Sequence, residues 1–132
     1  VAYRLIEDAV NFSAERKQFG KPIIEHQLIQ AMLADSRAEA FAGRSMVLEA
    51  ARSKDRGERV SLDASCCKLF CSEMVGRVAD RAVQIHGGAG YMADYPVERF
   101  YRDVRLFRIY EGTTQIQQIV IARELARQAG NS

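Results

Sequence analysis

The stretch that decides the fold is residues 62–91, LDASCCKLFCSEMVGRVADRAVQIHGGAGY. Apolar and small residues recur through 62–85 at helical spacing and without a proline, which predicts one long helix. Three glycines within four positions follow in 87–90, and a regular helix cannot accommodate them cheaply. The helix is therefore expected to end there, while Ser61 or Asp63 stands near its N-cap.

Helical spacing of apolar residues continues on both sides of this stretch. Gly20 and Pro22 suit the end of a first helix, a charged turn with a glycine over 54–59 follows a second, and Pro96 suits the start of a later one. No strand-like alternation and no internal repeat is visible. The sequence thus predicts an all-α fold, an up-down four-helix bundle with short connections. The other helices are expected over 1–15, 25–55, 97–106 and 114–128.

Length and composition place the chain among soluble globular domains. Its 132 residues suffice for one domain with one core, and 48% are apolar and 27% charged. The net charge of +2, from 19 basic and 17 acidic residues, argues against a dedicated nucleic-acid binder. No apolar stretch approaches the roughly 18 residues that span a bilayer. Because the chain begins at Val1, inside an expected helix, we interpret it as a fragment of a longer protein.

The three cysteines, Cys66, Cys67 and Cys71, lie close together on the predicted helix over 62–85. An odd count on one helix does not suggest a disulfide framework. A zinc site would need a fourth ligand, and the nearest histidine, His86, is far along the chain. We expect reduced cysteines that face the core, and no metal site.

The motif that bears most directly on chemistry is residues 109–116, IYEGTTQI. Here a single carboxylate, Glu111, directly precedes Gly112, which allows a ligand to approach the backbone closely. Thr113 or Thr114 can cap the helix that follows, which leaves free N–H groups and the positive end of a helix dipole near the carboxylate. A carboxylate on such a turn is a candidate general base.

Five motifs, taken in order, resemble the C-terminal helical domain of the acyl-CoA dehydrogenases over essentially the whole chain. They are ERKQFGKP at 15–22, HQ at 26–27, QIHGGAGY at 84–91, PVER at 96–99 with RD at 102–103, and IYEGT at 109–113. The resemblance implies that 1–132 form a single C-terminal helical domain, the third part of a three-domain flavoenzyme. Such enzymes contain FAD and oxidise an acyl-CoA thioester to the trans-2-enoyl-CoA, and electron-transferring flavoprotein usually reoxidises their flavin.

The resemblance also assigns roles around the turn at Glu111. Glu111 matches the base that removes the α-proton, and burial against apolar surfaces makes a carboxylate a stronger base. The backbone N–H of Glu111 would grip the thioester carbonyl together with a flavin hydroxyl, and Gly112 would leave room for this substrate group. The alternatives are a solvated carboxylate at position 111 and a glycine that only forms the turn.

Residues that match FAD contacts of the family lie in four motifs. Arg16 and Phe19 match contacts with the FAD of the neighbouring subunit, and the alternative is a helix-end arginine with a stapling phenylalanine. Thr113 and Gln115 follow the base, and either could instead cap the last helix. The whole expected cofactor-binding set is Arg16, Phe19, Gln27, Gln84, Gly87, Gly88, Thr113 and Gln115.

The resemblance further implies a homo-oligomer, a dimer or a tetramer, in the bacterial cytoplasm or the mitochondrial matrix. The expected partners are the acyl-CoA substrate and electron-transferring flavoprotein. We expect little or no dehydrogenase activity from the isolated chain, because the flavin-ring pocket belongs to the middle domain. Two competing hypotheses are an acyl-CoA oxidase-like flavoprotein and a non-catalytic bundle that serves oligomerisation.

Overall fold

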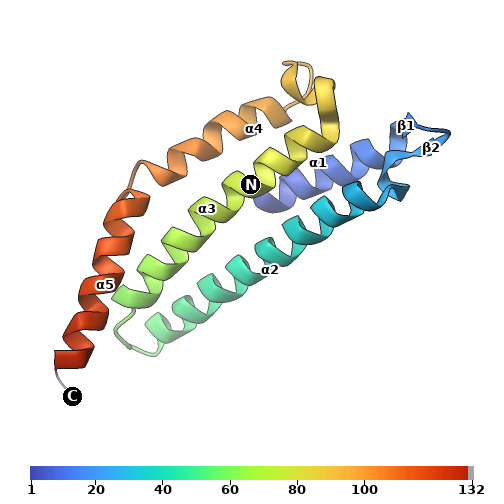
Figure 1. The fold of residues 1–132 in the computed structure, drawn as a ribbon. Coiled ribbons are helices and arrows are strands. Elements are labelled where there is room, and N and C mark those ends of the chain that lie inside the picture. The colour runs from blue at the N-terminus through green and yellow to red at the C-terminus, as the bar shows by residue number, and fades with distance from the viewer. Residues whose placement is uncertain (131–132) are drawn as a thin grey trace.

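The computed structural model describes residues 1–130 and consists mainly of helices (Figure 1). The predicted all-α bundle is confirmed, and the five α-helices begin and end close to the expected positions. In chain order the elements are α1 (Ala2–Glu15), β1 (Lys17–Gln18), β2 (Lys21–Pro22), η1 (Ile23–Glu25), α2 (Gln27–Asp55), α3 (Ser61–His86), η2 (Gly87–Tyr91), α4 (Val97–Val104), η3 (Arg105–Arg108) and α5 (Thr114–Gly130).

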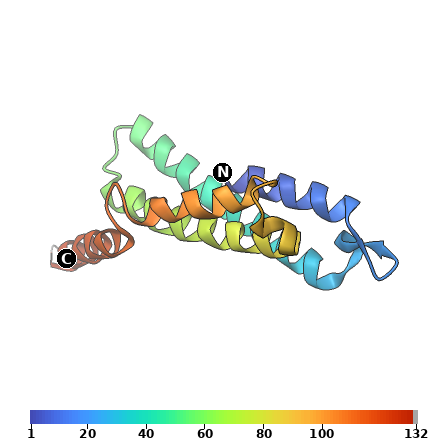
Figure 2. The same cartoon turned by 90° about the horizontal axis from the view of Figure 1, so that it is seen from above.

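Helix α3 is the central element, because α1, α2, α4 and α5 all contact it. Figure 1 shows α3 running between α2 and α4. The core forms where α1 and α4 meet α3, around the fully buried side chains of Leu5, Val78, Val97 and Val104. Helix α5 contains no buried residue and lies at one end of the molecule, past α4, as Figure 2 shows from above.

Residues 17–22 differ from the expectation. Helix α1 ends at Glu15, as expected, but the residues that follow it form a small antiparallel hairpin of β1 and β2, and Gly20 lies in the turn of this hairpin. Phe19 and Gly20 have φ angles of 54° and 81°, and two successive left-handed residues are typical of a tight hairpin turn. A left-handed phenylalanine is rare, so the sequence pattern did not indicate this turn.

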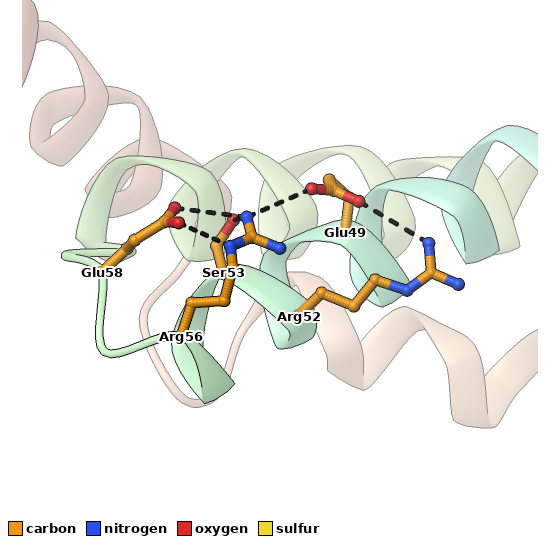
Figure 3. A network of polar contacts seen from close by, with 5 residues as sticks. All are labelled: Glu49, Arg52, Ser53, Arg56 and Glu58. Carbon is orange, nitrogen blue, oxygen red and sulfur yellow. Dashed lines mark hydrogen bonds and ion pairs between the residues drawn. The ribbon is translucent and has the colours of Figure 1, made fainter.

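The predicted charged turn between α2 and α3 is held by Arg56 (Figure 3). Its guanidinium donates to Glu58 at 2.6 Å and to the Ser53 hydroxyl at 2.8 Å. Helix α3 then begins at Ser61, directly after Val60, which provides no side-chain cap. The expected cap from Ser61 or Asp63 is therefore wrong, and the side-chain contacts of Arg56 secure the turn instead.

The glycine-rich stretch ends α3 as predicted. Gly87, the first residue of η2, has a φ of 58°. A Cβ at Gly90 would lie 2.7 Å from the carbonyl oxygen of Val83, so this glycine lets η2 pack onto α3. Phe12 of α1 stacks on His86 with ring centroids 4.3 Å apart, which fixes this end of α3 against α1.

The three cysteines of α3 are free and half-buried. Burial raises the pKa of the Cys71 thiol, and the neighbouring Cys67 adds to this effect. A thiol of raised pKa forms little thiolate at neutral pH and is unreactive. Across residues 1–130, no helix is both long and apolar enough to cross a membrane.

Candidate active site

A cavity of about 440 Å³ lies between the start of α1, the middle of α3 and the turn before α5. Its volume falls in the range of small-molecule sites, and its walls are mostly apolar. Glu111 lies at this cavity beside Tyr110, whose ring stacks on that of Phe107. The lining residues are Val1, Ala2, Lys68, Cys71, Ser72, Met74, Val75, Phe107, Tyr110 and Glu111.

Two successive left-handed residues shape the turn that carries the candidate base. Glu111 has a φ of 54° and Gly112 a φ of 85°. The Thr113 hydroxyl accepts a hydrogen bond from the backbone N–H of Ile116 at 3.2 Å. Of the two threonines that the sequence offered as caps of α5, Thr113 is therefore the one that caps the helix. The side chain of Glu111 is exposed, and it lies close to the N-terminal end of α5.

Two charged side chains of helix α3 hold this turn in place. Glu73 accepts a hydrogen bond from the Thr114 hydroxyl at 2.8 Å and pairs with Arg108 at 3.3 Å. Lys68 donates to the backbone carbonyls of Phe107 and Gly112. No sequence motif indicated either residue, although Lys68 and Glu73 are the only charged residues between Asp63 and Arg77.

The backbone of the turn leaves a donor available at Glu111. Among the described residues, its N–H meets no acceptor, whereas its carbonyl accepts from the Gln117 amide at 3.5 Å. A Cβ at Gly112 would lie 2.5 Å from the Gln117 nitrogen. The Gln117 side chain can move away, but the φ of 85° disfavours any residue with a side chain, so Gly112 is needed by the turn itself, in addition to any contact with substrate.

The expected cofactor residues of the first two motifs lie at the other end of α1. Arg16, Phe19 and Gln27 are all exposed there, and 93% of the Phe19 surface is accessible. Phe19 meets the His26 ring edge-on at 5.9 Å, and His26 Nε2 lies 3.2 Å from the carbonyl of Gln18. The 14 residues of α1 separate this hairpin from the cavity by about 21 Å at 1.5 Å per residue.

The other expected cofactor residues lie at the end of α3 and at the start of α5. A Cβ at Gly87 or Gly88 would meet nothing within 4 Å, so a ligand can approach the backbone there. Gln84 lines a neighbouring cavity of about 600 Å³. Thr113 and Gln115 line a polar cavity of about 260 Å³ beside Glu73. Within a single chain, the expected FAD contacts thus occupy three separate surfaces.

Comparison with known proteins decides which family this geometry represents. Residues 1–126 match the family model described as "Acyl-CoA dehydrogenase, C-terminal domain". The chain belongs to the acyl-CoA dehydrogenase family. It therefore carries the candidate base and the capped turn within a domain known in many related flavoproteins.

Two curated relatives of this acyl-CoA dehydrogenase domain differ in the reaction that their names state. Cyclohexane-1-carbonyl-CoA dehydrogenase of Geobacter metallireducens is 44% identical over 98% of this chain and 34% of its own length. Subunit CarC of the caffeyl-CoA reductase-Etf complex of Acetobacterium woodii is 43% identical over 96% of this chain and 34% of its own length. The chain thus spans about a third of the length of these relatives.

Solved structures give the same family relationship. Butyryl-CoA dehydrogenase from Megasphaera elsdenii superimposes with a TM-score of 0.92 at 41% identity, covering 95% of this chain and 33% of that one. An FAD complex of PigA superimposes with a TM-score of 0.91 at 30% identity, over 95% of this chain and 33% of that one. The acyl-CoA dehydrogenase domain therefore recurs in structures with FAD.

Proposed function

We propose that residues 1–132 form the C-terminal domain of an FAD-dependent acyl-CoA dehydrogenase, in which Glu111 is the base that removes the α-proton. The observation that carries this proposal is the place of Glu111 at a largely apolar cavity of about 440 Å³, with its backbone N–H unoccupied by the described residues. Apolar walls suit an acyl chain. A carboxylate beside them suits abstraction of the acidic α-proton of a thioester.

In the proposed reaction, Glu111 takes the α-proton onto its carboxylate. Its backbone N–H donates to the thioester carbonyl and stabilises the negative charge that develops there, and Gly112 leaves room for the thioester. An acyl chain and a flavin bound against the apolar walls of the cavity would exclude water from this exposed carboxylate, and loss of water makes a carboxylate a stronger base. FAD, when bound, supplies the acceptor for the β-hydride.

The residues proposed to hold FAD suit its parts. The exposed guanidinium of Arg16 suits a pyrophosphate, and the exposed ring of Phe19 suits packing against adenine or ribose. The open backbone at Gly87 and Gly88 suits close approach of a phosphate group. The full proposed set is Arg16, Phe19, Gln27, Gln84, Gly87, Gly88, Thr113 and Gln115.

The test is Glu111→Gln in the complete gene product, which contains the remaining domains. The variant keeps the shape of the side chain and removes the base. We expect anaerobic bleaching of the flavin by acyl-CoA thioesters to slow by about 1,000-fold, in the range usual for loss of an acid–base group. The measurement is the absorbance of the oxidised flavin after rapid mixing.

Glu7→Gln provides the matched control. Glu7 is an exposed carboxylate on α1, and the same chemical change there should leave the rate of bleaching within twofold of wild type. Wild-type bleaching by the Glu111→Gln protein would refute the proposed base. It would favour the non-catalytic bundle, in which this chain contributes to FAD binding or assembly but supplies no group to flavin reduction.

A second candidate is reduction of the enoyl thioester, and the similarity to CarC favours it. The same Glu111 would then return a proton to the α-carbon. The name of the CarC complex also supports an electron-transferring flavoprotein as partner. A complete enzyme that reduces enoyl-CoA faster than it oxidises acyl-CoA, with that partner present, would be a reductase.

A further inference from the structure

Lys68 projects from the middle of α3 toward the turn that carries Glu111. Its ammonium group donates to the backbone carbonyl of Phe107 and, at 3.2 Å, to that of Gly112. These two carbonyls bracket Glu111 in the sequence. Across the described residues, no carboxylate lies within ion-pairing distance of this ammonium group, so its contacts are with the backbone of the turn.

The two carbonyls need a donor that the turn cannot supply. The N–H groups of Ile109 and Tyr110 both donate to the carbonyl of Leu106. The carbonyl of Phe107 therefore receives no backbone donor at the end of η3. Carbonyls at the end of a helical turn attract a cation. A half-buried ammonium group in turn needs acceptors to replace the water it has lost.

The turn also needs an external restraint, because its backbone is unfavourable. A glutamate with φ of 54° persists only when its surroundings fix it. Glu73 fixes the flanks of the turn through Arg108 and Thr114. Lys68 connects the two sides of the turn. It binds the carbonyl of Phe107, which precedes the turn, and that of Gly112, the glycine directly after Glu111.

This arrangement keeps a cation close to the candidate base without pairing the two. Lys68 and Glu111 line the same cavity, yet the ammonium group is bound by carbonyls. In residues 1–130, no cation lies within ion-pairing distance of the Glu111 carboxylate, which is therefore free to accept a proton. A direct ion pair with lysine would have weakened it as a base.

We propose that Lys68 is a positioning residue for Glu111. Lys68 fixes the turn at 107–112 so that the carboxylate and the backbone N–H of Glu111 both meet the same thioester. This inference rests on the proposed function. It differs from a purely structural role in one respect. Loss of Lys68 should slow the proton-transfer step in protein that is folded and loaded with flavin.

The test uses Lys68→Met in the complete gene product. We measure the limiting rate of anaerobic flavin reduction per bound flavin at saturating acyl-CoA, together with the dissociation constant of the acyl-CoA. We expect the rate to fall about 100-fold, as for a misplacement near 1 Å, while the dissociation constant stays within about threefold. Lys68→Arg, which retains the charge and several donors, should recover most of the rate.

Lys54→Met is the matched control, because Lys54 is exposed near the end of α2, and its rate should equal that of wild type. Should Lys68→Met yield no flavin-loaded protein, Lys68→Gln takes its place with an expected loss of at least about tenfold, since its shorter amide cannot reach both carbonyls. An unchanged rate per bound flavin in the variant that folds would overturn the inference. So would a rate for Lys68→Arg as low as that of Lys68→Met.

Glu111→Gln measured in parallel separates this inference from the proposed function. If that variant reduces its flavin normally, Glu111 is not the base and the proposed function fails. If it loses flavin reduction while Lys68→Met retains the full rate, the base stands and only the role of Lys68 is refuted.

Discussion

Two residues of the described chain combine a side chain with a left-handed backbone, and they are Phe19 and Glu111. Both have a φ of 54°, and each precedes a glycine that is left-handed as well. Such conformations cost of order 1–3 kcal/mol at non-glycine residues and concentrate at functional sites. Sequence motifs also indicate both residues as candidate site residues. The backbone conformation thus supports, independently of the motifs, the proposed cofactor contact at Phe19 and the proposed base at Glu111.

Gly112→Ala tests whether the turn, and not merely overall stability, serves the chemistry. The alanine would be strained at φ 85°, and its Cβ would displace the Gln117 amide from the carbonyl of Glu111. We expect a loss of about 1 kcal/mol in stability and at least a tenfold slower flavin reduction. Thermal unfolding and rapid-mixing absorbance of the complete gene product measure the two effects.

Gly57→Ala is the control for Gly112→Ala. Gly57 has a φ of 80°, and an added Cβ there meets nothing within 4 Å. The backbone strain is thus nearly the same, and the melting temperature should fall to a similar extent. Equal rates of flavin reduction in the two variants would contradict a specific role for the turn at Gly112.

At the scale of elements, the sequence predicted what depends on local spacing. All five predicted helices begin and end within two residues of the observed bounds, and the predicted end of the helix over 97–106 falls in the 3₁₀ helix η3 that follows α4. The hairpin at 17–22 escaped prediction because it depends on a left-handed phenylalanine. The contacts of Lys68 and Glu73 escaped it because their partners lie about 40 residues further along the chain.

The packing of α2 on α3 includes a charged group whose effect depends on pH. Burial opposes ionisation of Glu39, but its hydrogen bond from Arg81 and the charge of Arg77, both at 3.0 Å, outweigh burial and lower its pKa. A carboxylate whose pKa is lower in the folded state stabilises the protein above its unfolded pKa. That contribution is lost as the pH falls through the folded pKa.

Glu39→Gln should therefore lower the stability of the complete gene product by about 1 kcal/mol at pH 7. The difference in melting temperature from wild type should shrink as the pH falls below about 4.3, the ordinary pKa of glutamate. Thermal unfolding of both proteins between pH 7 and pH 3 measures this. Glu49→Gln, which alters a more exposed ion pair in Figure 3, should have a smaller effect at pH 7. A difference for Glu39→Gln that grows with acidity would contradict this sign.

At the scale of the whole molecule, a single chain leaves much apolar surface uncovered. Leu28 and Phe41 on α2 are 81% and 61% exposed, and Ile116 and Leu125 on α5 are 49% and 52% exposed. Apolar surface of this extent indicates contact with further protein. The separation of the hairpin from the Glu111 cavity by the length of α1 favours the same conclusion (Figure 1). Both features support the homo-oligomer that the resemblance implies, in which Arg16 would serve the FAD of the neighbouring subunit.

Mixed oligomers test whether Arg16 acts across the subunit boundary. In a pair of Glu111→Gln and Arg16→Ala subunits, action across the boundary leaves one site with both defects and the other with an intact base and an intact arginine. Action within one subunit leaves every site with one defect. Because a two-fold pair has two equivalent sites, we expect differently tagged, co-expressed mixed pairs to recover about half the wild-type rate. Each variant purified alone should be severely impaired, and mixed pairs no faster than these parents would show that Arg16 contacts the FAD beside Glu111 of its own subunit.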